Sequence, residues 1–175
     1  MNPLKRALDP MMRRVMLSIG RAVVELINDA TKMQSAQVSL LDDEVRDNVE
    51  RFQNFGFTSV PEAGAEGVAL SVAGNRDHVI LVAVDDRRYR KLGLLTGESC
   101  VYDKWGNFIL LKENGIEIVH SARLTITAPL VQINGHLQVS GTVVAVGNVS
   151  GAGKSLATHV HGGVQAGGSN TSAPI

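Results

Sequence analysis

Hydrophobic residues in the first part of the chain recur at the spacing of an amphipathic helix. Val15, Ile19, Ala22 and Leu26 occupy positions i, i+4, i+7 and i+11, so they share one stripe on a helical surface. The pattern predicts a helix from about residue 1 to residue 30, and we assign residues 1–32 to an N-terminal helical segment. The apolar stretch is too short, and too interrupted by charge, to span a bilayer.

From about residue 34 to residue 112, apolar and polar residues alternate in short runs. Gly, Pro, Asn and Asp separate these runs. About five short strands over this length fit a small closed barrel such as an OB-fold, which we assign to residues 33–112. The expected strands cover residues 36–41, 66–73, 78–84, 98–102 and 107–112.

An OB barrel raises the question of nucleic-acid binding, which such barrels perform with a basic groove and stacking aromatic side chains. Residues 87–91 read Arg-Arg-Tyr-Arg-Lys and are the one candidate for such a groove. Asp85 and Asp86 directly precede them and partly offset their charge. Nucleic-acid binding is therefore a minor alternative, and we expect no nucleic-acid partner.

Between residues 115 and 150 the alternation of apolar and polar residues is almost unbroken, so each strand has one apolar face. The apolar residues are even-numbered as far as Leu130 and odd-numbered from Val131 onward, so the pattern changes beside Pro129. In the second part, glycine recurs every six residues, at Gly135, Gly141 and Gly147. The apolar residues are Ile116, Ile118, Ala122, Leu124, Ile126 and Leu130, followed by Val131, Ile133, Leu137, Val139, Val143, Ala145 and Val149.

A lone sheet of this kind would leave long edges and an open apolar face, which natural proteins avoid. The glycine spacing resembles a β-solenoid, whose repeats need stacked neighbours, but the region is too short for a solenoid of one chain. Three chains wound around one axis would complete one another's strands. We therefore predict a homotrimer in which residues 113–155 form an intertwined trimeric β-prism. A single-chain sheet packed on the barrel is the alternative.

Near the end of the chain, His159 and His161 are the candidate metal ligands. Residues i and i+2 of an extended segment project to the same side, so both imidazoles face together. One such pair is a weak signal, because two histidines near a terminus are usually only polar surface residues. Threefold symmetry would bring six imidazoles to one point, an octahedral site suited to a first-row transition ion such as iron. With no open coordination position, the ion would be structural, and we predict about one iron per trimer in an apex over residues 156–175.

Composition excludes several classes of function. Lys and Arg together number 17, as do Asp and Glu, so no net charge draws the chain toward nucleic acid or anionic lipid. The single Cys100 rules out an internal disulfide and is consistent with assembly in a reducing cytoplasm. The sequence has no Ser/His/Asp arrangement with supporting motifs, no HExxH and no glycosidase-type carboxylate pair. We therefore predict neither catalytic nor cofactor-binding residues, and no small-molecule substrate.

Residues 151–155, Gly-Ala-Gly-Lys-Ser, imitate the end of a phosphate-binding loop. That motif needs glycine where this chain has Asn148, and it needs a helix after the loop. The residues that follow do not have a helical pattern, so we expect a flexible hinge between the rod and the tip.

Three blocks of the chain resemble the baseplate central spike proteins of Mu-like phages, which are related to the membrane-piercing spikes of P2-like phages and of contractile bacteriocins. The first block, residues 37–61, includes Glu-Val-Arg-Asp-Asn-Val-Glu-Arg-Phe-Gln and Phe-Gly-Phe-Thr-Ser-Val-Pro. The second, residues 82–103, includes Val-Ala-Val-Asp-Asp-Arg-Arg-Tyr-Arg. The third, residues 159–174, begins His-Val-His-Gly-Gly-Val-Gln-Ala-Gly-Gly.

This resemblance implies an OB-fold, an intertwined trimeric β-helix, and a pointed tip where His159 and His161 of three chains hold iron. It also implies a spike at the baseplate tip of a virion, bound to hub and tail-tube proteins and driven into the host outer membrane when the sheath contracts. Some members carry calcium or chloride on the axis, but no residue here assigns either ion. The alternative is a trimeric receptor- or glycan-binding tail fibre, against which the aromatic content of 4% argues.

Overall fold

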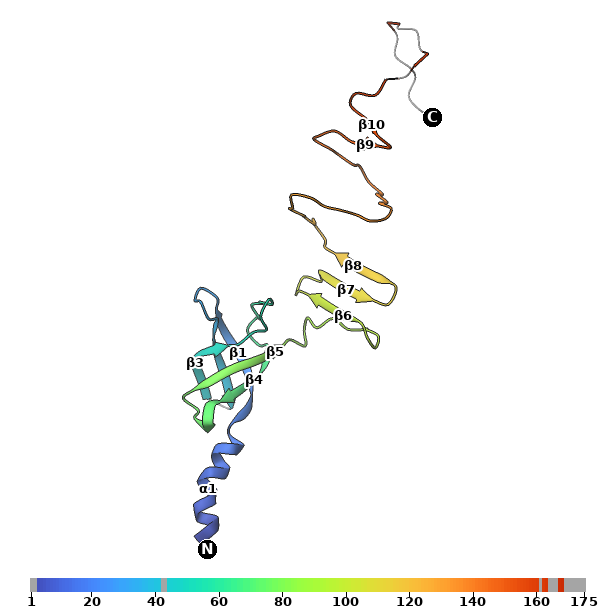
Figure 1. The fold of residues 1–175 in the computed structure, drawn as a ribbon. Coiled ribbons are helices and arrows are strands. Elements are labelled where there is room, and N and C mark those ends of the chain that lie inside the picture. The colour runs from blue at the N-terminus through green and yellow to red at the C-terminus, as the bar shows by residue number, and fades with distance from the viewer. Residues whose placement is uncertain (1–2, 42–43, 161, 164–166, 169–175) are drawn as a thin grey trace. The chain divides into compact units, whose positions relative to one another are not determined.

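The computed structural model describes residues 3–41, 44–160, 162–163 and 167–168, and the chain divides into two units, Met1–Thr125 and Ile126–Ile175 (Figure 1). The first unit begins with helix α1 (Pro3–Met16). This helix ends where Leu17 N–H donates to the carbonyl of Arg13 at 3.0 Å and the Ser18 hydroxyl donates to that of Arg14 at 2.7 Å. Within the described part of the chain, no helix is both long enough and apolar enough to cross a membrane.

The prediction of a helix as far as residue 30 is wrong, because β1 (Ile19–Asn28) is a strand. Ala22 and Val24 alternate into the core, whereas Ile19 and Leu26 of the proposed helical stripe are exposed. Pairing with strands on both sides of β1 supplies hydrogen bonds and burial that outweigh local helix propensity.

Five strands close into an OB-like barrel: β1, β2 (Ser35–Leu41), β3 (Glu44–Arg51), β4 (Glu66–Ser71) and β5 (Val79–Asp85). Their order around the barrel is β1-β2-β3-β5-β4, and β1 pairs with both β2 and β4. The β3–β5 pair is parallel, and the other pairs are antiparallel. The predicted barrel is thus confirmed, but its strands lie within residues 19–85. Two of its strands, β1 and β3, replace the expected strands at residues 98–102 and 107–112.

Small and β-branched side chains fill the narrow interior of the barrel. The core consists of Ala22, Val24, Ala36, Val38, Val49, Ala65, Ala69, Val79 and Leu81. Gly67 on β4 lets two strands approach closely, since a Cβ atom there would lie 2.7 Å from Leu81 Cδ1 and 2.8 Å from the carbonyl oxygen of Ala83. The barrel therefore depends on close backbone approach as well as on apolar burial.

The remaining strands of the first unit form a separate antiparallel sheet. Its order is β6 (Ser99–Tyr102), β7 (Phe108–Lys112) and β8 (Gly115–Val119). Residues 98–102 and 107–112 are therefore strands, as predicted, but they lie outside the barrel.

The second unit has few internal hydrogen bonds between strands among its described residues. Residues 126–149 are extended segments and bends, followed by a hairpin of β9 (Ser150–Gly151) and β10 (Lys154–Ser155). Ala152 and Gly153 form its turn with φ of 50° and 75°, the left-handed values that a tight hairpin turn requires. Residues 151–155 are thus part of a hairpin rather than the expected flexible hinge, and the described residues 156–160 directly after it form no helix of the kind that a phosphate-binding loop needs.

Candidate assembly surface and metal site

One face of the β6–β8 sheet carries five aliphatic side chains and Ser99, and we call it the aliphatic face. Residues directly opposite each other in an antiparallel sheet point to the same side. The registers pair Val101 with Ile109, Ile109 with Ile118, and Leu111 with Ile116. All five side chains are exposed, from 42% for Ile109 to 65% for Ile116. The described chain leaves this face without cover.

The other face of the same sheet is packed within the chain. Leu110 is buried, the Lys91 ammonium lies 3.9 Å from the centroid of the Phe108 ring, and Lys112 Nζ lies 2.6 Å from Glu117 Oε1. The sheet therefore has one face that makes contacts within the chain and one face that presents five aliphatic side chains and Ser99.

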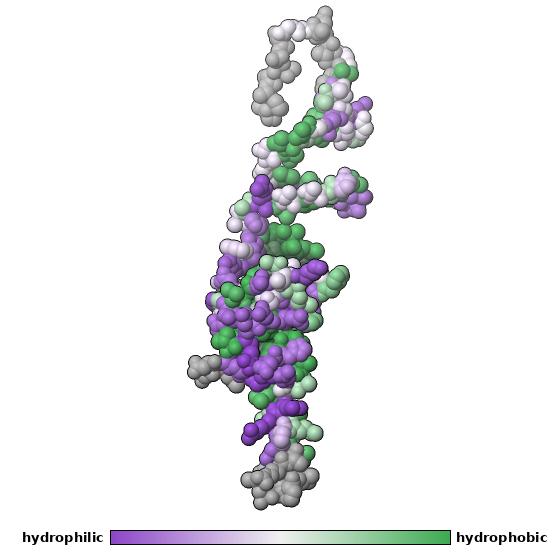
Figure 2. Space-filling model, turned by 90° about the vertical axis from the view of Figure 1, so that its left-hand side faces the viewer, coloured by the Kyte–Doolittle hydropathy of each residue, from purple (hydrophilic) through white to green (hydrophobic). Residues whose placement is uncertain are grey.

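Apolar exposure continues in the second unit. Figure 2 shows hydrophobic residues, in green, at the surface of this segment. The exposed residues include most of those predicted to share strand faces: Ile126, Leu130, Val131, Ile133, Leu137, Val139, Val143 and Val149. The segment has the alternation of buried strands, yet its described residues bury none of these side chains.

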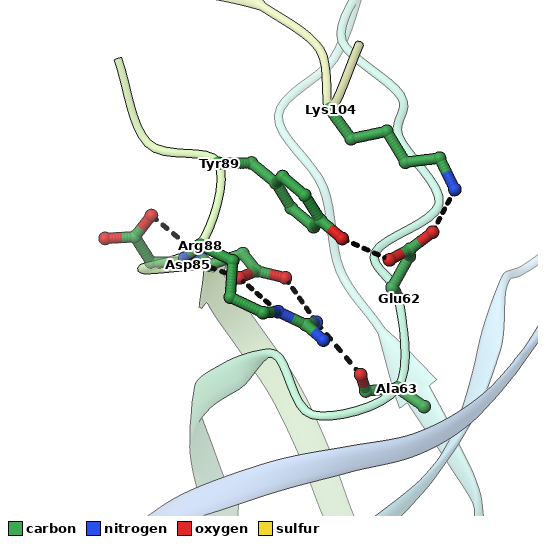
Figure 3. Close-up of polar contacts among 7 residues, drawn as sticks. Glu62, Ala63, Asp85, Arg88, Tyr89 and Lys104 are labelled. Atoms are coloured by element: carbon green, nitrogen blue, oxygen red, sulfur yellow. Dashed lines mark hydrogen bonds and ion pairs between the residues drawn. The ribbon is translucent and has the colours of Figure 1, made fainter. Parts of the chain in front are cut away.

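A polar cluster, the Glu62 junction, joins the barrel to the β6–β8 sheet (Figure 3). The Tyr89 hydroxyl donates to Glu62 Oε2 at 2.7 Å, and Lys104 of the β6–β7 turn pairs with Glu62 Oε1. The bond from Lys104, followed by that from Tyr89, holds the pKa of Glu62 below its ordinary value. The same carboxylate raises the pKa of Lys104 and of Tyr89. One side chain thus ties three loops together.

Three of the four cations at residues 87–91, namely Arg87, Arg88 and Lys91, are engaged within the chain. Arg87 Nε lies 2.7 Å from Glu66 Oε1, and Arg88 binds both carboxylate oxygens of Asp86, at 2.9 and 2.7 Å. Arg88 also donates to the carbonyl of Ala63 at 2.9 Å (Figure 3). Arg87, Arg88 and Lys91 already have anionic or aromatic partners, so the arrangement does not favour nucleic-acid binding.

Hydrogen bonds of Asn148 and Ser155 order the backbone between the β9–β10 hairpin and His159. Asn148 Oδ1 accepts from the Ser155 hydroxyl at 3.0 Å and from the backbone N–H of Ala157 at 3.2 Å. Ser155 Oγ in turn accepts from Thr158 N–H at 3.2 Å, and the Ser155 carbonyl accepts from His159 N–H at 3.0 Å. The hairpin therefore fixes the backbone that carries His159.

The His159 ring is oriented by backbone carbonyl groups. Its Nδ1 lies 3.1 Å from the carbonyl oxygens of both Ser155 and Leu156, which can only accept, so Nδ1 carries the proton. In the neutral ring this tautomer leaves the lone pair on Nε2, and such a carbonyl contact is typical of histidines that bind metals. His161, the other predicted ligand, lies outside the described residues. Among those described, no three His, Cys, Asp or Glu residues cluster to hold an ion within one chain.

Sequence reasoning missed Asn148, Ser155 and the Glu62 junction. The sequence indicates only that Asn148 stands where a phosphate-binding loop needs glycine. The available signal was that Asn and Ser next to a tight turn bond readily to nearby backbone groups. Nothing in the sequence pairs Glu62 with Lys104, because their contact depends on the tertiary fold.

Comparison with known proteins places these features in a family. Residues 21–88 match the family model for the N-terminal part of bacteriophage Mu Gp45, and residues 155–174 match the GpV apex motif. The chain is 38% identical to the baseplate puncturing device gp45 of Escherichia phage Mu, with 91% of each chain covered. It is 39% identical to the Mu-like prophage FluMu protein gp45 of Haemophilus influenzae, covering 90% of this chain and 87% of the relative. The chain therefore belongs to the Mu gp45 family of phage tail proteins.

Proposed function

We propose that this protein is the central spike that punctures the host envelope from the baseplate of a Mu-like phage tail. Its likeness to the puncturing device of phage Mu covers 91% of the chain, and residues 155–174 separately match the apex motif. This likeness supports a virion baseplate component with a structural role, and it favours puncturing over the alternative of a receptor- or glycan-binding fibre.

The spike acts as a homotrimer, and the aliphatic face of β6–β8 is the observation that carries this part of the proposal. Five exposed aliphatic side chains on adjacent strands are stable in water only if another apolar surface covers them. Three copies around one axis cover one another's faces without leaving an open edge. The same arrangement buries the exposed apolar residues of the second unit.

A rod of three intertwined chains suits the mechanical task. Backbone groups of residues 126–149 that lack partners within the chain bond to strands of the two other chains. Many such interchain bonds act in parallel, so a compressive load is shared along the rod rather than borne by one weak contact.

Iron at the apex is the remaining element of the proposal. His159 and His161 from each of three chains would supply six imidazole ligands, and the carbonyl contacts of His159 Nδ1 suit this role. When bound, the ion crosslinks three chain ends that would otherwise fray, and it leaves no position for a substrate. Its role is structural.

The first unit contacts the phage. We assign the barrel and α1 to contacts with the hub and tail-tube proteins, and the apex to the host outer membrane. Helix α1 supports this assignment because Met11, Val15 and Met16 are exposed beside Arg13 and Arg14, an apolar and basic surface that a partner protein can cover.

Native mass spectrometry of the full chain tests stoichiometry and metal together. We expect a trimer with about one iron, and we expect His159→Ala/His161→Ala to lose the iron. His78→Ala, which alters an unrelated histidine on the barrel, is the matched control and should keep it. A monomer contradicts the trimeric spike, and iron retained by the double variant contradicts the apex site.

A further inference from the structure

Three of the four phenylalanines in the chain lie in one short loop that follows β3. We call residues 52–60 the phenylalanine loop. Phe55 is fully exposed and Phe57 is 67% exposed, so neither ring packs on its own barrel. In a chain with so few aromatic residues, this concentration at the surface requires a physical explanation.

The loop is held in one conformation by its own hydrogen bonds. Gln53 Oε1 accepts from Ser59 N–H at 2.9 Å, and Gln53 Nε2 donates to Thr58 Oγ1 at 3.3 Å. Phe57 N–H donates to the carbonyl of Asn54 at 3.0 Å across a turn in which Gly56 has φ of 87°. The two rings are therefore displayed on a closed turn rather than on a loose strand.

A buried cation fixes the base of the loop. Arg51 is 8% exposed, and its guanidinium donates to the Ser59 carbonyl at 2.7 Å, to Ser59 Oγ at 3.0 Å and to Gln34 Oε1 at 2.5 Å. Burial lowers the pKa of Arg51, so the fold expends free energy to hold this contact. Because the loop is ordered before any partner arrives, binding through Phe55 and Phe57 loses little conformational entropy.

The chemistry of the loop favours a recess with a largely apolar surface as its partner. No charged residue occurs from Phe52 to Pro61. Rigid aromatic side chains of this kind act as anchors that fill pockets in a partner surface.

The same chain carries a recess of that kind beside the Glu62 junction. A cleft of about 750 Å³ is lined by Val60, Pro61, Val84, Tyr89, Tyr102 and Trp105, together with several charged residues. The charged lining residues are all hydrogen-bonded or ion-paired within the chain, so an uncharged occupant leaves each with its partner; they are Arg51, Glu62, Asp85, Asp86, Asp103 and Lys104. Phe55 and Phe57 do not line this cleft, although the loop's own C-terminal end does. They are therefore available to the cleft of another copy.

We propose that Phe55 and Phe57 of one chain insert into the cleft of the next chain, so that the three barrels lock into a closed ring. A contact between two different surfaces of the same protein closes after three copies when the rotation is threefold. The cleft reaches the β6–β7 turn at Trp105, so the contact is continuous with the sheet whose aliphatic face meets the other chains. This inference rests on the proposed trimer.

Photo-crosslinking tests the contact in the full chain. Benzoylphenylalanine at position 55 should give crosslinked pairs of chains, and mass spectrometry should map the second end to residues 60–61, 84–89 or 102–105. The matched control places the same probe at Leu26, an exposed apolar position on β1, and should give only background. Phe57→Ser should weaken the crosslink from position 55 while native mass spectrometry still reports a trimer, because the rod holds the chains together.

The outcomes separate this inference from the proposed function. A trimer that gives no crosslink from position 55, or gives one that maps elsewhere on the chain, overturns the ring contact and leaves the spike intact. A crosslink to a different baseplate protein in assembled particles also overturns it. A monomeric chain contradicts the trimeric spike itself.

Discussion

Ile109 and Ile118 lie directly opposite each other on β7 and β8, and both remain exposed, at 42% and 53%. A cross-strand pair of isoleucines covers part of each side chain, but it cannot cover the side of the sheet on which both stand. The pair therefore lies at the centre of an apolar surface that only a second apolar layer can bury.

A charge in the middle of this face should weaken assembly. We expect the Ile109→Lys trimer to dissociate at a lower temperature than the wild type, because an ammonium group buried between three sheets would lack a partner. The matched control is Val119→Lys at the end of β8, on the opposite face and with similar exposure, which should dissociate at the wild-type temperature. Native mass spectrometry over a temperature series checks both variants, and equal dissociation temperatures would show that the aliphatic face is not the interface.

The barrel as an architecture could be predicted from short alternating runs, but two of its strands could not. In β1, residues Ala22, Val24 and Leu26 alternate, yet Ala22 and Leu26 also fit a helical stripe, and only tertiary pairing selects the strand. In β3, Val45 and Val49 have the same parity, but Val45 is exposed and Val49 is buried. Asn48, with φ of 55°, interrupts the regular strand between them, and a period-two pattern cannot anticipate such an interruption.

The candidate metal site at the tip could also be predicted only in part from the sequence. The spacing of His159 and His161 is a local pattern, so it can be recognised from the chain alone. The bonds from Asn148 and Ser155 depend on a hairpin whose turn contains alanine in a left-handed conformation, a position where glycine or asparagine is expected. The support of the site is therefore harder to predict than its ligands.

Removing the Asn148 side chain should weaken iron binding without touching a predicted ligand. Asn148→Ala deletes the acceptor that bonds the Ser155 hydroxyl and Ala157 N–H, so the backbone leading to His159 is less well fixed. We expect iron affinity to fall about tenfold, as for other supporting groups around a metal. Asn134→Ala is the matched control, since its amide bonds only the nearby Gln132 among the contacts of the described chain.

Metal analysis after dialysis against a graded series of chelator concentrations measures this effect. Equal iron retention in Asn148→Ala and Asn134→Ala would show that the hairpin does not support the apex.

The Glu62 junction should make stability depend on pH. The pKa of Glu62 is lowered in the folded chain, chiefly by Lys104 and next by Tyr89. Its contribution to stability is therefore complete above the unfolded pKa of about 4.3 and is lost as the pH falls through the lower folded value. We expect the wild-type protein to melt above Glu62→Gln at neutral pH, with the gap closing below about pH 4.

Thermal melts of both proteins between neutral and acid pH measure this gap. Glu113→Gln, in the β7–β8 turn, controls for the loss of one carboxylate, and we expect it to melt close to the wild type throughout. A gap between wild type and Glu62→Gln that does not change with pH would mean that the junction is not held by the ionised carboxylate.

Close packing of the barrel should make a side chain at Gly67 destabilising, whereas Gly20 on the neighbouring strand β1 should accept one. In Gly67→Ala, the new methyl group would meet Leu81 Cδ1 and the Ala83 carbonyl oxygen at under 3 Å. That carbonyl belongs to β5, which pairs with β4 along this stretch, so it cannot withdraw without disturbing the barrel. We expect a loss of about 1–3 kcal/mol, typical of an overpacked core. At Gly20 on β1, a methyl group would have no atom within 4 Å, so Gly20→Ala should be neutral or slightly stabilising, because alanine restricts the unfolded chain. Urea unfolding followed by circular dichroism compares the two variants, and equal midpoints would contradict the close approach of β4 and β5.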